Sequence, residues 1–368
     1  MNDERANSAA PSLFGVSVAR SNAAADAINP SLAAPFPAAP STSAPSVDNL
    51  AIGVRAANRA TLARAISLVE STLPRHRAAA DALINTIIPH TGHATRVGIT
   101  GVPGAGKSTF IQQLGLLLCD QGHRVAVLAI DPSSAISGGS ILGDRTRMGR
   151  LATHPNAFIR PSPAGSTLGG VARRTREAAL LCEAAGFDII LIETVGVGQS
   201  EAVVSDMVDC VLCLAIAGAG DELQGIKRGV LERVGVIAVN KADGNNAEPA
   251  KRAAADLRAA MRVLHHDPLD PVQVLTCSAA TGENIAHVWH AVIDKITRQR
   301  EDGRLDAIRR DQLQRWLDAL IDERLHSLLD QTAGARDALD QARADVRAQR
   351  VTPAVAADRV IAHLRSEL

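Results

Sequence analysis

Short apolar runs alternate with helical patterns through the middle of the chain. Seven such runs lie between residues 94 and 302, and they read ATRVGIT, HRVAVLAI, NAFIR, FDIILIE, VDCVLCLAI, GVIAVN and VQVLTC. Ala-rich segments with helical spacing, such as AEPAKRAAADLRAAMRVL, separate several of them. Strands that alternate with helices form a mainly parallel sheet with helices on both faces. The pattern therefore predicts an α/β domain over residues 94–302, and ligands of such domains bind at the carboxyl ends of the strands.

Helical patterns flank this domain on both sides. In residues 49–93, an apolar stripe at helical spacing runs from Leu62 to Val69, and a second helix follows Pro74. We expect this segment to form an N-terminal helical extension of the α/β domain.

A wide apolar stripe marks the C-terminal segment, residues 303–368. At helical spacing it contains Leu313, Trp316, Leu317, Leu320, Ile321, Leu325, Leu328 and Leu329. Thr352 and Pro353 form a good N-cap and N1 pair for a last helix. So wide a stripe must be buried, either on the chain's own core or in a dimer with a second copy.

Residues 1–48 have the composition of a disordered tail. Ala, Pro and Ser fill 27 of these 48 positions (13, 6 and 8), which leaves few large apolar groups to offset the entropy of ordering. A transit peptide fits less well, because Arg is sparse and the acids Asp3 and Glu4 lie near the start.

Composition excludes several classes of function. The formal net charge is zero and aromatic residues make up 2%, which argues against a nucleic-acid partner. No apolar run reaches the roughly 18 residues that span a membrane, and no secretory signal is evident.

Five scattered cysteines fit a reducing cytoplasm. Cys210 and Cys213 share a strand but face opposite sides, so we interpret them as small buried hydrophobes rather than metal ligands.

The run GVPGAGKST, residues 101–109, matches the phosphate-binding P-loop pattern G-x-x-x-x-G-K-[ST] between a strand and a helix. Its backbone N–H groups would surround the phosphates, Lys107 would reach the β- and γ-phosphates, and Ser108 would offer its hydroxyl to Mg²⁺. The predicted nucleotide-binding residues of this loop are Gly101, Val102, Pro103, Gly104, Ala105, Gly106, Lys107, Ser108 and Thr109.

Two later motifs indicate that the base is guanine. NKAD, residues 240–243, follows the strand GVIAV, and Asp243 would accept two hydrogen bonds that adenine does not offer. Asn240 and Lys241 would brace the loop and cover the base. SAATG follows the next strand, and we expect its first residues, Ser278, Ala279 and Ala280, to line the guanine site, with a backbone N–H near Ala279 on O6.

Acidic residues follow two strands at the same predicted edge. Asp131 ends HRVAVLAI, and its carboxylate should face the nucleotide. Glu193 begins ETVGVGQSE after a buried strand, and it is long enough to reach Mg²⁺ directly or through a water molecule. The N–H of Gly196 would meet the γ-phosphate. A further segment, residues 218–229, is either a nucleotide-sensing loop or a solvated helix start.

The motifs GVPGAGKST, DPSS followed by GGSILGDRTRM, ETVGVGQSE, GDELQGIKRG and NKAD occur in an order that resembles the MeaB/ArgK family. These P-loop GTPases act as chaperones of adenosylcobalamin-dependent acyl-CoA mutases. The resemblance covers about residues 49–368 and implies a homodimer with a C-terminal dimerisation arm. It implies Mg²⁺ ligands at Ser108, Asp131, Asp144 and Glu193, and a signalling role for Lys227.

We therefore expect a Mg²⁺-dependent GTPase that gates cofactor loading of methylmalonyl-CoA mutase or a relative. Lys107, Asp131 and Glu193 are the expected catalytic residues, with Asp131 positioning water, and GTP and GDP are the bound nucleotides. Whether the partner is methylmalonyl-CoA mutase or a related acyl-CoA mutase stays open, because Gly235 stands where family members commonly have an acid. Two alternatives are a nickel-maturation GTPase, which needs a Cys/His cluster, and a transporter-associated ATPase or kinase, which NKAD argues against.

Overall fold

The computed structural model describes residues 46–131, 148–163, 168–194, 200–218, 231–264, 270–332 and 334–367. The predictions for Asp144, Gly196, Lys227 and most of the N-terminal tail lie outside these residues, as does the side chain of Asp131.

Within the described residues, seven strands form one sheet with the order β3-β2-β4-β1-β5-β6-β7. The strands are β1 (Thr95–Gly101), β2 (Val125–Asp131), β3 (Ala157–Pro163), β4 (Ile189–Glu193), β5 (Cys210–Ile216), β6 (Val236–Asn240) and β7 (Gln273–Thr276). All neighbouring pairs are parallel, so the predicted parallel sheet is confirmed. Every carboxyl end therefore lies at one edge of the sheet.

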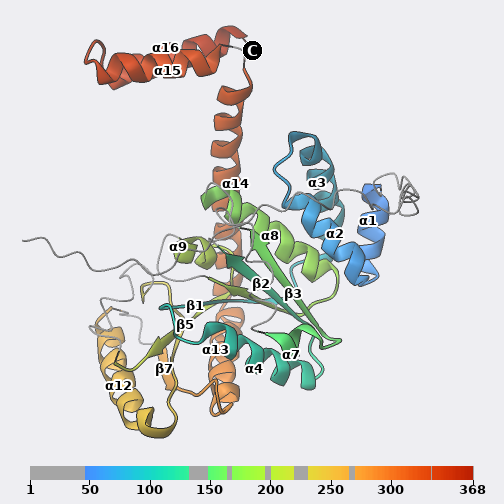
Figure 1. Cartoon of the computed structure of the whole chain (residues 1–368), viewed down its shortest axis with the longest axis vertical. Helices are drawn as coiled ribbons and strands as arrows, with labels where there is room; N and C mark the ends of the chain where they lie inside the picture. Colours follow the sequence, from blue (N-terminus) through green and yellow to red (C-terminus); the bar gives the residue numbers. More distant parts are fainter. Residues whose placement is uncertain are drawn as a thin grey trace, which may run out of the picture. The chain divides into compact units, whose positions relative to one another are not determined.

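Helices cover both faces of the sheet (Figure 1). One face packs against α4 (Lys107–Asp120), α7 (Gly149–Ala152) and α13 (Ile285–Glu301). The other face packs against α8 (Leu168–Ala184), α9 (Ser200–Ser205) and α12 (Ala247–Leu264). Short 3₁₀ turns lie at Ile88–His90 and Gly244–Asn246. Cys210 belongs to the first core and Cys213 to the second, as expected for alternating strand positions.

The N-terminal extension consists of α1 (Val47–Arg55), α2 (Arg59–Val69) and α3 (Pro74–Ile87), which pack against α8. Helix α1 begins two residues before the predicted segment, where the Ser46 hydroxyl accepts a hydrogen bond from the Asn49 N–H at 3.3 Å. Arg77 of α3 forms an ion pair of 3.1 Å with Glu177 of α8. Burial raises the pKa of Glu177, and Arg77 opposes that rise, so the pair stabilises the contact only while both partners remain.

The C-terminal segment forms α14 (Arg304–Gln331), α15 (Ala335–Arg347) and α16 (Pro353–Glu367). The Val355 N–H lies 3.4 Å from the Thr352 hydroxyl, which confirms the predicted N-cap. The apolar stripe of α14 divides into two faces. Trp316 packs against the core of the α/β domain. Five side chains on the other face are 38–57% exposed, namely Leu313, Leu317, Ile321, Leu325 and Leu328.

The helices and the cysteines bear on membrane insertion and on disulfide bonding. No helix in the described ranges is long and apolar enough to span a membrane. The cysteines all fall within the described residues, and each is buried and free of a disulfide.

Candidate active site

The P-loop lies between β1 and α4 and approaches two neighbouring strands. Gly101 has a φ of 142°, and a Cβ there would lie 2.2 Å from the carbonyl oxygen of Leu214 on β5. Gly106 has a φ of 87°, and a Cβ there would lie 2.7 Å from the side-chain nitrogen of Asn240 on β6. Only glycine permits both the backbone conformation and the close approach at these positions.

A cavity of about 560 Å³ opens beside this loop. Its volume is in the usual range for small-molecule sites. The cavity is lined by Pro103, Gly104, Gly106, Lys107, Ser108, Thr109, Ala129, Ile130, Glu193 and Lys241. The structure therefore brings the predicted phosphate-binding loop, the acid of ETVG and the lysine of NKAD to one site.

Lys107 is buried, and its ammonium group contacts the loop itself. Nζ donates hydrogen bonds to the carbonyl oxygens of Gly101 at 2.8 Å and Val102 at 3.3 Å. Lys107 is also the first residue of α4, so the positive end of the helix dipole faces the same cavity. A lysine and a helix N-terminus together make this end of the cavity suitable for phosphate.

Ser108 and Glu193 meet at the edge of the sheet. The Ser108 hydroxyl donates a hydrogen bond of 2.9 Å to Oε1 of Glu193, which is 8% exposed. The register places Glu193 opposite Ile99 on β1 and opposite Ala129 on β2, two residues before Asp131. The backbone of Asp131 thus reaches the same edge.

The pair of oxygen ligands fits Mg²⁺. Mg²⁺ is usually held by one or two protein oxygens, with phosphates and water completing the shell. Among the described residues, no group of three or more His, Cys, Asp or Glu side chains is placed to hold a metal ion. A hydroxyl and a carboxylate that touch, as in Ser108 and Glu193, suit a metal that binds together with a nucleotide.

The base-binding end is arranged around Asn240 and Asp243. Asn240 is buried, donates from Nδ2 to the Ala105 carbonyl at 2.7 Å and accepts from the Ala279 N–H at 2.9 Å. The Ser278 hydroxyl donates to Oδ1 of Asp243 at 2.6 Å. These contacts join NKAD to the P-loop on one side and to SAATG on the other.

Residues 62–334 match the protein family described as methylmalonyl Co-A mutase-associated GTPase MeaB. The chain belongs to the MeaB family. This match contains the P-loop, ETVG, NKAD and SAATG segments together, so it includes the whole site described above.

Known relatives agree with membership of the MeaB family. A probable GTPase of Mycobacterium bovis is 51% identical over 320 residues, covering 86% of this chain and 94% of that protein. The GTPase ArgK of Escherichia coli is 50% identical over 266 residues, covering 72% and 80%. A mouse protein named methylmalonic aciduria type A homolog, mitochondrial, is 42% identical over 331 residues, covering 87% and 80%.

A solved structure gives the same fold. It is described as an LAO/AO transport system kinase, is 37% identical, and has a TM-score of 0.69 over 87% of this chain and 98% of its own. The relatives and the family match show that the chain is a GTPase, as NKAD predicted.

Two parts of this MeaB-family site were not evident from the sequence. Thr194 is fully buried, and its backbone N–H donates to the Ile99 carbonyl at 3.0 Å. Its hydroxyl donates to the hydroxyl of Thr100 at 3.1 Å. It thereby fixes the start of ETVG to the P-loop strand. The role of Ser278 in orienting Asp243 was also missed, although a hydroxyl beside the predicted base loop was a usable signal.

Hydrogen bonds within the protein hold the base-binding loops. The Ala279 N–H donates to Oδ1 of Asn240 at 2.9 Å, and the contact of an N–H near Ala279 with guanine O6 stays a prediction. Lys241 has a φ of 59°, and its carbonyl accepts from Nδ2 of Asn246 at 2.7 Å. The loop is therefore held in a conformation that is uncommon for a non-glycine residue, as often occurs at functional sites.

Proposed function

We propose that this GTPase escorts an adenosylcobalamin-dependent acyl-CoA mutase, either methylmalonyl-CoA mutase or a relative. In this proposal its nucleotide state gates the loading of the cofactor and the removal of damaged cofactor. The observation that carries the proposal is the match of residues 62–334 to a family named for its association with methylmalonyl-CoA mutase. The name of the mouse relative, which refers to methylmalonic aciduria, supports it.

The chain's own groups support a mainly electrostatic hydrolysis. Lys107 and the N-terminus of α4 would hold the phosphate oxygens, and Ser108 and Glu193 would hold Mg²⁺. Mg²⁺, when bound, would neutralise charge that develops on the phosphates. Asp131 is proposed to orient the attacking water, because β2 carries its backbone to the same edge as Glu193.

Guanine is the proposed base because the Ser278 hydroxyl orients the carboxylate of Asp243. The Ser278 hydroxyl accepts from the Thr281 N–H at 3.2 Å, so its own hydrogen is available for Asp243. Guanine would satisfy this carboxylate with two donors, whereas adenine would leave it without them.

The exposed face of α14 supports a homodimer as the working form. Its five large apolar side chains recur from Leu313 to Leu328, through the middle and the C-terminal part of the helix, and water-exposed apolar surface of that extent favours association. An apolar groove of about 460 Å³ continues from the end of α14 between α15 and α16, where Leu329, Leu339 and Val360 contribute to its walls. A second copy of the chain is the proposed occupant, because the same face on each protomer would make a two-fold interface.

The cytoplasm is the proposed location. The five cysteines are buried and form no disulfide, as is usual in a reducing compartment. We propose no nucleic-acid partner, because the net charge is zero.

Capture of a mutase by the purified protein tests the proposed function. The tagged full-length chain is loaded with GDP or with a non-hydrolysable GTP analogue and mixed with methylmalonyl-CoA mutase, with and without adenosylcobalamin. We expect capture that depends on the nucleotide. A Lys107→Ala variant serves as the control that lacks phosphate binding. Absence of binding in every nucleotide and cofactor state would contradict the proposal.

A further inference from the structure

Helix α9 packs directly against the strand that carries the P-loop. It is a six-residue helix that follows the ETVGVG segment in the chain. A Cβ at Gly98 of β1 would lie 2.6 Å from Cγ1 of Val204 and 3.3 Å from Cγ2 of Val208. Glycine at this position therefore lets α9 and the turn after it lie in van der Waals contact with β1, three residues before the P-loop begins.

The C-terminal end of α9 is held by a buried side chain of α14. Gln312 is 3% exposed, and its Nε2 donates to the carbonyl of Val208 at 2.7 Å and to that of Ser205 at 3.3 Å. The last carbonyls of a helix lack partners within the helix, so an amide donor from another element stabilises this end. Gln312 thus connects the end of α9 to the helix that carries the exposed apolar face.

Arg176 of α8 reinforces the same contact. Its guanidinium donates to the Gln312 carbonyl at 2.9 Å and to the Asp206 carbonyl, and it lies 5.0 Å from the ring centre of Trp316 on α14. Burial lowers the pKa of Arg176 to about 10, so it remains a cation at neutral pH. Three helices therefore meet through one set of buried and part-buried hydrogen bonds.

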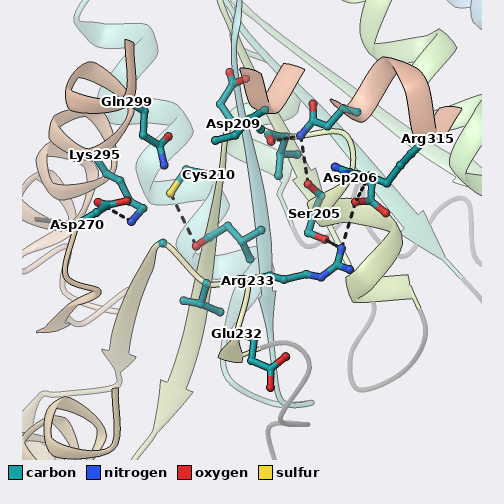
Figure 2. A pocket seen from close by; sticks show the side chains of 16 residues that line it. Ser205, Asp206, Asp209, Cys210, Glu232, Arg233, Asp270, Lys295, Gln299 and Arg315 are labelled. Atoms are coloured by element: carbon teal, nitrogen blue, oxygen red, sulfur yellow. Dashed lines mark hydrogen bonds and ion pairs between the residues drawn. The ribbon is translucent and has the colours of Figure 1, made fainter. Parts of the chain in front are cut away.

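Ion pairs around Asp206 extend this connection toward solvent. Oδ1 of Asp206 pairs with Arg233 at 3.1 Å and with Arg315 of α14 at 3.1 Å. Figure 2 shows these three side chains with Ser205 on one side of a cavity of about 460 Å³. Arg233 follows residues 218–229 in the chain, and Arg233 and Arg315 are about half exposed. Such half-exposed ion pairs contribute little stability by themselves. The buried hydrogen bonds of Gln312 are therefore the stronger link between α9 and α14.

We infer that Gln312 is a positioning residue that couples the P-loop strand, through α9, to α14 and the C-terminal helices. A displacement of α9 that accompanies a change of nucleotide would then move α14, and a displacement of α14 would move α9 against β1. This coupling rests on the GTPase activity alone and not on the mutase partner. Its test therefore needs only the purified full-length protein.

The test compares Gln312→Met with Gln314→Met. Methionine keeps the length of the side chain and removes the amide, and Gln314 is an exposed position on the same helix. For Gln312→Met we expect kcat for GTP hydrolysis to fall about three- to tenfold, the effect of losing roughly one hydrogen bond, with KM for GTP unchanged. Gln314→Met should match the wild type in both constants.

A second readout separates coupling from simple loss of structure. In the wild type, amide hydrogen exchange of residues 304–320 should differ between GDP and a non-hydrolysable GTP analogue, and Gln312→Met should remove the difference. Asp206→Asn, which weakens only the exposed pairs, should reduce it partly and covers the case in which Gln312→Met does not fold. Exchange in α14 that is independent of the nucleotide in the wild type would overturn the inference, as would an unchanged kcat in Gln312→Met.

Discussion

At the scale of single residues, Glu193 decides how the edge of the sheet can bind a cation. Its side chain is one methylene longer than the Asp that usually follows this strand in P-loop proteins, and it reaches the Ser108 hydroxyl at 2.9 Å. A carboxylate and a hydroxyl that already touch can bind one small hard cation with little rearrangement. Glu193 can therefore do what the usual Asp does, because its longer side chain reaches the cation site from a backbone position slightly further away.

Replacement of Glu193 by Gln should weaken the response to Mg²⁺. The amide oxygen can still accept from Ser108, but the negative charge is lost, so we expect the Mg²⁺ concentration for half-maximal hydrolysis to rise by about 10- to 100-fold. A magnesium titration of GTP hydrolysis measures it. Glu301→Gln, at the exposed end of α13, is the matched control. Equal magnesium dependence in both variants would remove Glu193 from the site.

Asp243→Asn should change the preferred base. The amide no longer accepts both guanine donors and presents a donor of its own, so GTP affinity should fall by about 100-fold while xanthosine triphosphate binds better than in the wild type. Isothermal titration with both nucleotides measures this. An unchanged affinity for GTP would show that Asp243 does not read the base.

At the scale of elements, the buried strands were predictable and some helices were not. The inner strands β2, β4, β1, β5 and β6 are largely buried and form continuous apolar runs, and the edge strands β3 and β7 are shorter runs, so all seven were found from the sequence. Helix α15 was missed as a separate element, because its polar sequence has few large apolar residues. The apolar stripe of α14 was recognised, but its division into a packed and an exposed face depends on where α8 and α9 lie.

The site was predictable where a motif is contiguous in sequence. GVPGAGKST and NKAD each place several groups by one local turn, and the structure brings both to a common region. Contacts that join distant segments were not visible. Neither the contact of Thr194 with β1 nor that of Gln312 with the turn after α9 follows from local pattern, since each contact depends on the packing of elements far apart in the chain.

Gly98→Ala should destabilise the contact between β1 and α9. The added Cβ would lie 2.6 Å from a methyl group of Val204, a stiff β-branched side chain, so we expect a loss of about 1–3 kcal/mol in the free energy of unfolding. Chemical denaturation measures the loss, and the double variant Gly98→Ala, Val204→Ala should recover part of it. Full stability of the single variant would mean that α9 does not pack against β1 in this way.

At the scale of the whole molecule, the exposed apolar face of α14 predicts the oligomeric state. Leu317→Lys places a charge in the middle of this face and should convert the proposed dimer to a monomer in light scattering coupled to size exclusion. Asp322→Lys adds the same side chain to α14 outside the stripe and should leave the dimer intact. A monomeric wild-type protein would contradict the dimer, as would a dimeric Leu317→Lys variant.

Single-turnover hydrolysis of GTP, with and without an adenosylcobalamin-dependent methylmalonyl-CoA mutase, tests the central claim most directly. The account predicts slow hydrolysis by the GTPase alone, because no Gln directly follows ETVG to orient the attacking water as in Ras-like switches. Addition of the mutase should raise the rate by about tenfold or more, equivalent to roughly 1.4 kcal/mol of barrier. The same rate with and without the mutase, in both its apo and cofactor-bound forms, would contradict the account.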